Sequence, residues 1–298
     1  ALLRVQRRLQ AEAESNSVAL SHETRDLIGR SFELKSLGPR TLKGFELPRE
    51  VYLATSERSL ETRFEATRSE SDVPLVGRDE EMALLLRTWE AALNGKGQVI
   101  MLSGEAGIGK SRIAQAFIER IGDGPGELLR YQCAPYHANS AFHPIVDRLR
   151  RAAKLRMTND PGESYERVEA LVRSHFLDPD RDAPVYAKLL GLTPPNPELL
   201  TGLEPQELKR RIIETLARSV VARAERFPLL MLVEDTHWID PSSLEAFERV
   251  VEICGDLPVM LLVTHRTEWT STWPVDHPHV SVLRLGPLSG EHIARLIE

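Results

Sequence analysis

Residues 99–122 read VIMLSGEAGIGKSRIAQAFIERIG and carry the strongest indication of the fold. It opens with an apolar run of the length of a buried strand, continues through a glycine-rich turn, and then repeats apolar residues at helical spacing, at Ile113, Phe117 and Ile121. The eight residues 104–111 match the phosphate-binding pattern GxxxxGK[ST] in the strand-to-helix context that this pattern requires. The stretch therefore predicts a nucleotide-binding α/β fold.

The glycine-rich turn supplies the predicted phosphate site. The residues expected to line it are Gly104, Glu105, Ala106, Gly107, Ile108, Gly109, Lys110 and Ser111. Glycines let the backbone approach phosphate oxygens, so consecutive N–H groups and the helix N-terminus form a partly positive cradle. We expect the Lys110 amino group to reach the β- and γ-phosphates and the Ser111 hydroxyl to bind Mg²⁺. The predicted ligands are ATP or ADP with Mg²⁺.

A phosphate site of this kind needs an acidic group at the end of a neighbouring strand, and residues 227–235, FPLLMLVED, supply two. Adjacent residues at a strand end point in different directions, so we assign Glu234 to the Mg²⁺ shell and Asp235 to orienting or deprotonating the attacking water. From the residues alone, Glu234 and Asp235 can also have the opposite roles. His237 and Trp238 follow, and they either sense the nucleotide, contact another domain or pack in the turn.

A second apolar run, PVMLLVTHRTEW at 258–269, brings polar groups to the same sheet edge. Arg266 is the candidate for reading the γ-phosphate, because a planar guanidinium can hold phosphate oxygens and stabilise developing charge. A solvated surface arginine is the alternative reading of the same pattern.

From Leu75 onward, short β-rich runs alternate with helical stretches, which is typical of a parallel sheet covered on both faces. The expected strands are 99–103, 128–133, 229–234, 259–264 and 280–285, with a mostly helical insertion between the second and third. In that insertion, four residues recur at four-residue spacing and predict a core-facing helix: Leu208, Ile212, Leu216 and Val220. Asp240 and Pro241 are expected to begin a later helix. The predicted fold class is thus α/β, a P-loop fold with a parallel sheet and a helical insertion.

The chain before this domain has a different pattern. Residues 17–54 indicate a small α+β unit in which Ser21 caps a short helix. The polar stretch that follows lacks apolar periodicity and is typical of a linker. We therefore divide the chain into residues 1–54, a linker at 55–73, and the α/β domain at 74–298.

Charge, apolar content and cysteine number bear on the binding partners and the location of the protein. The chain has 38 basic and 44 acidic residues and a net charge of -6, so no global positive field exists to hold nucleic acid or an anionic membrane. No apolar run approaches the roughly 20 residues that span a bilayer, and the N-terminus lacks a signal-peptide core. Cys133 and Cys254 lie in apolar stretches and are expected to be buried thiols in a reducing compartment. A cytoplasmic location is the prediction.

Four segments together resemble the AAA-type and STAND-type signalling ATPases of multidomain bacterial regulators: PLVGRDEE at 74–81, GEAGIGKS, LLMLVEDTHWIDPSSLE and LLVTHRTEW. In that family the segment before the P-loop folds over adenine, which implies that Val76, Gly77 and Arg78 form the wall beside the base. The family's first acidic position is more often Asp, whereas this chain has Glu234.

That resemblance implies a regulatory module that binds and slowly hydrolyses ATP in signal transduction. Its nucleotide state would control attached or partner signalling domains, and nucleotide-dependent self-association is a further expectation. A DNA-associated AAA-type loader is an alternative, but the chain shows no basic recognition helix. In relatives the chain continues beyond GPLSGEHIARLIE into further helices, so the resemblance implies a C-terminally incomplete domain.

The first 54 residues resemble the C-terminal part of a class III adenylate/guanylate cyclase domain, through the segments at 8–29 and 32–54. In such cyclases an Asn, and an Arg four residues later, stabilise the transition state. Arg4 and Arg8 occupy these positions here, so the Asn is missing. The metal-binding carboxylates would lie before Ala1, so cyclase activity is not expected of this chain alone. A purine nucleotide cyclase regulated by the ATPase is the alternative function.

Overall fold

The computed structural model describes residues 18–28, 32–40, 48–57, 75–122, 124, 126–155, 160–269, 273 and 277–297. The chain forms two compact units, residues 1–73 and residues 74–298. Arg4 and Arg8 lie outside the described residues, as does most of the proposed linker. The division into a cyclase-like fragment and a linker stays a prediction.

The first unit is built around a small antiparallel sheet. Its elements are β1 (Val18–Ser21), α2 (His22–Ile28), β2 (Phe32–Arg40) and β3 (Arg49–Glu57). The strand order is β1-β3-β2, with both pairs antiparallel. The Ser21 hydroxyl accepts a hydrogen bond from the Thr24 N–H at 3.3 Å, which is the predicted helix cap. This arrangement confirms the expected α+β unit. It does not test the resemblance to a cyclase domain.

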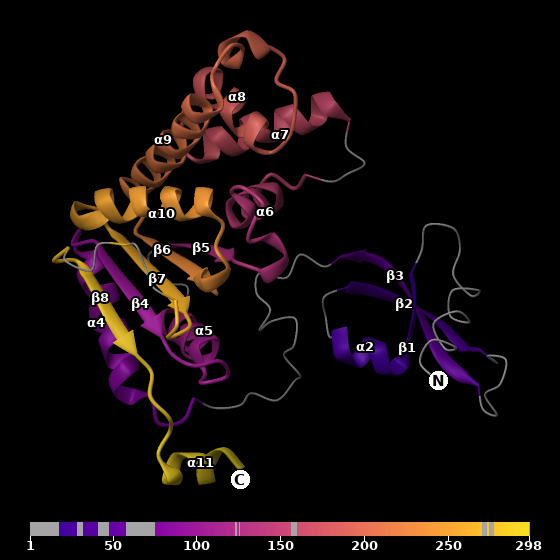
Figure 1. Ribbon diagram of the computed structural model, residues 1–298, viewed down its shortest axis with the longest axis vertical. Coiled ribbons are helices and arrows are strands. Elements are labelled where there is room, and N and C mark those ends of the chain that lie inside the picture. Colours follow the sequence, from indigo (N-terminus) through magenta and orange to yellow (C-terminus); the bar gives the residue numbers. More distant parts are fainter. Residues whose placement is uncertain are drawn as a thin grey trace. The chain divides into compact units, whose positions relative to one another are not determined.

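The second unit contains a parallel sheet with helices on both faces (Figure 1). Its strands and principal helices are α4 (Asp79–Leu93), β4 (Gln98–Ser103), α5 (Lys110–Ile121), β5 (Glu127–Gln132), α6 (His143–Ala152), α7 (Pro161–Ser174), α8 (Pro179–Leu189), α9 (Pro205–Ala224), β6 (Leu229–Glu234), α10 (Pro241–Ile253), β7 (Val259–His265), β8 (Val280–Arg284) and α11 (Gly290–Ile297). Short 3₁₀ turns join them: η2 (Pro135–His137), η3 (Pro197–Leu200), η4 (Thr236–Trp238) and η5 (Cys254–Asp256). Among the described residues, the strand order is β5-β6-β7-β4-β8 and every pairing is parallel. The predicted fold class is confirmed.

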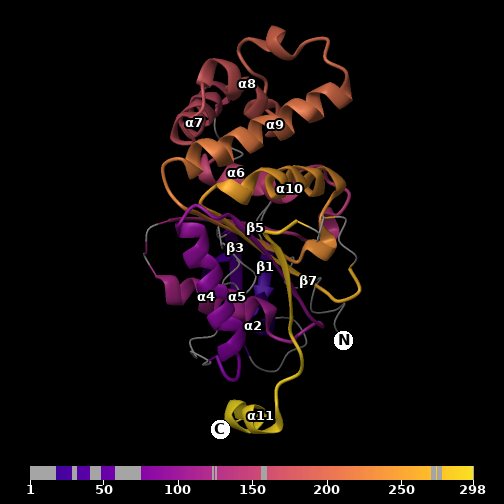
Figure 2. The same cartoon turned by 90° about the vertical axis from the view of Figure 1, so that its left-hand side faces the viewer.

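The four central side chains of β4 show why this strand is apolar between Gln98 and Ser103. Val99 and Met101 join the core on one face of the sheet, whereas Ile100 and Leu102 join the core on the other. Successive residues of a strand point to opposite faces, so a strand covered on both sides needs an apolar residue at each position. In Figures 1 and 2, α4 and α5 cover one face, and α10 and α6 cover the other.

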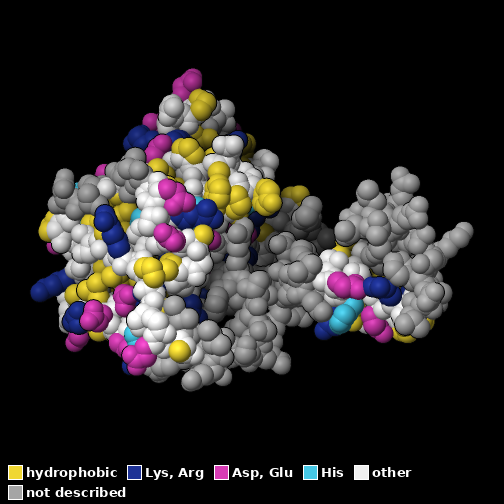
Figure 3. Space-filling model, turned by 60° about the horizontal axis from the view of Figure 1, so that its bottom comes forward, with side chains coloured by type: hydrophobic (Ala, Val, Ile, Leu, Met, Phe, Trp, Pro, Cys, Tyr) yellow, Lys and Arg dark blue, Asp and Glu magenta, His cyan; other side chains and the backbone are white. Residues whose placement is uncertain are grey.

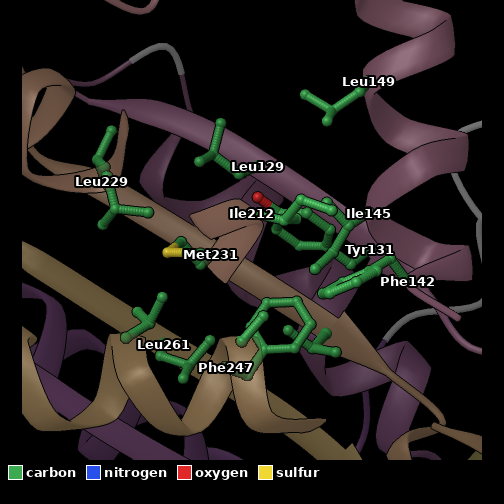
Figure 4. Close-up of a cluster of buried hydrophobic side chains, with 14 of the residues drawn as sticks. Leu129, Tyr131, Phe142, Ile145, Leu149, Ile212, Leu229, Met231, Phe247 and Leu261 are labelled. Atoms are coloured by element: carbon green, nitrogen blue, oxygen red, sulfur yellow. The ribbon is translucent and has the colours of Figure 1, made fainter. Parts of the chain in front are cut away.

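The larger core lies between the sheet and the layer formed by α10 and α6 (Figure 4). Tyr131 of β5 meets Phe247 of α10 edge to face, with ring centroids 5.1 Å apart. The predicted stripe of α9 faces this core: Ile212 and Val220 are buried, and Leu208 and Leu216 pack against the cluster while partly exposed. The stripe is therefore structural.

A hydrogen-bond network that is buried except at Glu127 fixes the helical insertion to the sheet. The Arg223 guanidinium of α9 donates from Nε to Glu127 of β5 at 2.9 Å and lies 3.2 Å, through Nη1, from His175 Nε2. His175 Nδ1 lies 3.1 Å from the Tyr186 hydroxyl of α8. Burial, together with the charges of Arg223 and Arg148, lowers the pKa of His175 to about 2, so this imidazole is neutral. The network orients α7, α8 and α9 on one sheet edge.

Asp240 joins two distant segments and begins α10, as predicted. Its carboxylate accepts hydrogen bonds from the N–H groups of Ser242 and Ser243, and also from those of Phe142 and His143 before α6. Phe142 has a left-handed φ of 59°, a conformation that needs such external support. This aspartate is 1% exposed.

Replacing Asp240 with Ala is expected to lower the free energy of unfolding by about 2–4 kcal/mol, since a lost cap adds to buried N–H groups left without an acceptor. Urea denaturation measures the loss. Asp160 caps α7 with an exposed carboxylate that, among the described residues, accepts hydrogen bonds from the N–H groups of Gly162 and Glu163. The control Asp160→Ala should therefore cost about 1 kcal/mol. Equal losses for the two variants would contradict the bridging role of Asp240.

Three further expectations concern the surface and the thiols. In the described residues, no helix is both long and apolar enough to span a bilayer. Acidic and basic side chains are interspersed on the face of the second unit drawn in Figure 3. Cys133 and Cys254 are free and buried, as predicted, and burial raises the pKa of both thiols.

Candidate nucleotide site

The glycine-rich turn lies between β4 and α5, at the carboxyl edge of the sheet. Gly107 and Gly109 have φ values of 78° and 102°, in a region that favours glycine. Residues 105–107 are exposed, and Gly109 is the N-cap of α5 and has no side chain to bond the first N–H groups of the helix. The turn therefore presents open backbone N–H groups at a helix N-terminus, which is the arrangement that binds phosphate.

Lys110 folds back over this turn. Its Nζ donates to the carbonyl oxygens of Gly104 at 2.7 Å and Glu105 at 2.8 Å. Burial lowers the pKa of the amino group below its ordinary value; the carboxylate of Asp235 opposes this shift and the guanidinium of Arg266 adds to it. The amino group is thus held beside the turn, with two neutral carbonyl partners that an anionic phosphate can replace.

The acidic pair ends β6, as predicted, but β6 is not the immediate neighbour of the P-loop strand. β7 lies between them, paired with β4 on one side and β6 on the other. The expectation of a neighbouring strand was wrong on this point, because spacing along the chain does not determine strand order. The intervening strand places Glu234 and Asp235 one strand further from the glycine turn along the same edge.

Asp235 is held in a specific orientation. Its φ of 57° is left-handed, its N–H donates to the Thr264 hydroxyl at 3.0 Å, and its carboxylate accepts from the Gln132 side-chain amide at 3.0 Å. Two strands thus hold this residue after the end of β6: Thr264 of β7 accepts from its backbone N–H, and Gln132 of β5 donates to its carboxylate. Sequence reasoning missed Gln132, although its place at the end of β5 put it on the same edge.

Arg266 follows β7 and stays partly exposed. Its side chain is 39% exposed and lies 3.8 Å from the Glu268 carboxylate. Its guanidinium carbon lies 5.8 Å from the ring centroid of Trp238. The charge of Arg266 acts on Lys110, which agrees with a position near the glycine turn. Its role at the γ-phosphate stays a prediction.

The proposed adenine wall lies where the entry to α4 meets the chain after β8. Val76 is buried, and Arg78 donates to the carbonyl oxygens of Ile108 at 3.4 Å and Gly286 at 2.8 Å. Gly77 has a φ of 66°, and an added Cβ would lie 2.3 Å from His292 Nδ1. Arg78 therefore ties the P-loop to the β8 exit, a link between distant segments that the sequence did not reveal.

Ser111 and Glu234 are the residues that would hold Mg²⁺. Ser111 is half-buried in the first turn of α5, and Glu234 is buried at the end of β6. The part of the chain that the structure describes holds no group of three or more His, Cys, Asp and Glu side chains that could bind a metal by themselves. This donor set fits Mg²⁺, which keeps several waters and takes oxygen ligands from nucleotide phosphates.

A parallel sheet, a glycine turn at a helix N-terminus, a lysine beside it and an acidic pair on the same edge define a P-loop nucleotide-binding domain. Residues 74–262 match the family model described as AAA ATPase domain, and the chain belongs to this family. Membership implies nucleotide binding, typically with Mg²⁺, and indicates hydrolysis of a nucleoside triphosphate. The match begins at residue 74, so the cyclase resemblance of the first unit stays a prediction.

Individual relatives add sequence and structural likeness. The chain is 32% identical to an uncharacterized protein of Rhizobium meliloti over 98% of its own length, and it spans 28% of that relative. It is similar to Cdc6p from Pyrobaculum aerophilum, with 15% identity and a TM-score of 0.43, over 77% of this chain and 51% of that one. It is also similar to the Aeropyrum pernix Orc1 protein solved in complex with DNA, with 15% identity and a TM-score of 0.40, over 76% and 50% of the two chains.

Proposed function

We propose that this chain is the ATP-binding, slowly hydrolysing regulatory module of a signal-transduction protein. The observation that carries the proposal is the position of Lys110, whose amino group is held on the glycine turn by two carbonyl oxygens and lies within the electrostatic influence of Asp235 and Arg266. A cation, a candidate base and a second cation are thus close enough to interact electrostatically at this turn. These are the groups that phosphoryl transfer to water requires.

In this proposal each residue has a separate task. The N–H groups of residues 104–111 and Lys110 bind the phosphates, and Ser111 and Glu234 hold Mg²⁺, which neutralises developing charge when bound. Asp235 orients the attacking water or accepts its proton. Gln132 holds its carboxylate, and Thr264 holds its backbone N–H. Arg266 approaches the γ-phosphate. Loss of that phosphate would release these contacts and alter the domains attached to the module.

The experiment is phosphate release from ATP by the purified chain. We expect slow release that requires Mg²⁺ and stops with excess EDTA. Limited proteolysis checks the regulatory part: the accessibility of residues 55–73 should differ between the ATP-bound and ADP-bound chain. Absence of both nucleotide binding and phosphate release would refute the proposal, and identical proteolysis in the two states would refute its regulatory part.

A further inference from the structure

Among the described residues, three histidines have a buried ring nitrogen without a hydrogen-bond partner: His143, His237 and His265. His237 and His265 follow β6 and end β7 at the carboxyl edge of the sheet. In η4, both Nδ1 and Nε2 of His237 are buried and lack a partner among the described residues. At the end of β7, His265 Nδ1 lies 2.8 Å from the Arg266 carbonyl oxygen, and its Nε2 lacks such a partner in the same part of the chain. A buried imidazole always has at least one N–H donor, and an unpaired buried donor is destabilising. Such groups call for an explanation, commonly a ligand or a water.

The position of His237 is fixed by its neighbours in the chain. The Thr236 hydroxyl donates to the Thr264 carbonyl oxygen at 3.1 Å, and the Asp235 N–H donates to the Thr264 hydroxyl. These bonds hold η4 against the end of β7. On the other side, the ring centroids of His237 and Trp238 lie 5.1 Å apart, and the Arg266 guanidinium lies over the Trp238 ring. His237 is therefore anchored rather than part of a loose loop.

The charged side chains that act on His237 include residues of the candidate nucleotide site. Burial lowers the pKa of its imidazole, and the positive charges of Arg266 and Lys110 act in the same direction, while Asp235 and Glu268 oppose them. Lys110 comes from the P-loop, and Arg266 from the exit of β7. The ring therefore lies within reach of the groups to which we assign the γ-phosphate.

We propose that His237 is a second sensor of the terminal phosphate: one ring N–H donates to an oxygen of the γ-phosphate of bound ATP, an acceptor that ADP lacks. This inference rests on the proposed function. It favours His237 over His265, because His265 already uses one ring nitrogen at the Arg266 carbonyl oxygen. When the γ-phosphate leaves, His237 loses this bond, next to Trp238 and three residues before Asp240, the cap of α10. His237 is a positioning and sensing group, and Asp235 remains the candidate base.

The test compares a triphosphate with a diphosphate in full-length variants of this chain. His237→Leu fills the site without a donor, and His237→Gln restores an N–H donor. With Mg²⁺ present, we expect Leu to lower affinity for β,γ-imido-ATP by about tenfold or more, as for a hydrogen bond to a charged group, and to leave ADP affinity unchanged. Gln should recover much of the loss. The matched control is His277→Leu, located before β8 at the opposite edge, which should change neither affinity.

Two outcomes overturn the inference. Equal weakening of both nucleotides would make His237 a packing residue, and unchanged affinities would assign its ring nitrogens to water. If the wild type binds nucleotide and the variants give either of these outcomes, only this inference is refuted. If the wild type binds neither nucleotide, the proposed function is refuted as well. If His237→Leu does not fold, ¹⁵N-histidine NMR of the wild type decides. The ring signal missing from His237→Gln should shift with β,γ-imido-ATP and not with ADP, and identical spectra would overturn the inference.

Discussion

Replacing Lys110 with Ala is expected to weaken MgATP binding by about 10- to 100-fold. Hydrogen bonds to charged groups contribute about 1.5–3 kcal/mol, and each 1.4 kcal/mol is about tenfold in affinity. The loss should be large because the amino group is already buried at the glycine turn and oriented by Gly104 and Glu105. The variant should keep its fold, since the amino group bonds two backbone carbonyl oxygens of the turn, and one of them belongs to the exposed Glu105, where water can replace it.

Fluorescence titration with a labelled ATP analogue measures this effect, and circular dichroism checks the fold. Lys96→Ala removes an exposed lysine just before β4, at the opposite edge of the sheet, and serves as the matched control. It should bind like the wild type. If Lys110→Ala binds MgATP as tightly as the wild type, ATP does not bind at the glycine turn.

Replacing Asp235 with Asn is expected to lower kcat for ATP hydrolysis by about 10²- to 10⁴-fold while ATP still binds, because the amide cannot accept the proton of the attacking water. The change is isosteric, and the Asn side-chain oxygen can still accept from Gln132. Single-turnover hydrolysis measures the rate separately from binding and product release.

Glu234→Gln and Asp256→Asn complete this comparison. Glu234→Gln should raise the Mg²⁺ concentration needed for activity, and Asp256→Asn, an exposed position before β7 at the other edge, should change nothing. If Asp235→Asn hydrolyses ATP at the wild-type rate and Glu234→Gln does not hydrolyse it, the two carboxylates have exchanged roles.

The strands and the phosphate turn followed from local pattern. Leu229–Glu234 was predicted with its exact bounds, since an apolar run closed by two acids is a local signal. The strand order was not predictable in the same way. That β7 lies between β4 and β6 depends on its pairing with β4, which joins residues more than 100 positions apart and which hydrophobic periodicity does not encode.

In the candidate site, too, features of continuous sequence were predictable and contacts between distant residues were not. Gly104 to Ser111 is continuous, so its residues, its glycine conformations and its helix N-terminus could be anticipated together. The support of Asp235 by Gln132 and Thr264, and the link of Arg78 to Gly286, join residues 29 to 208 positions apart. The orphaned ring nitrogens of His237 depend on burial and missing partners, which only three-dimensional structure reveals.

Isothermal titration of MgATP into the unmodified chain shows whether the chain binds ATP at this turn. We expect one nucleotide per chain, binding that ADP competes away, and loss of most of the affinity in Lys110→Ala. Absence of binding to the wild type, or binding that the Lys110 and Lys96 variants show equally, would contradict an ATP site at Gly104 to Ser111.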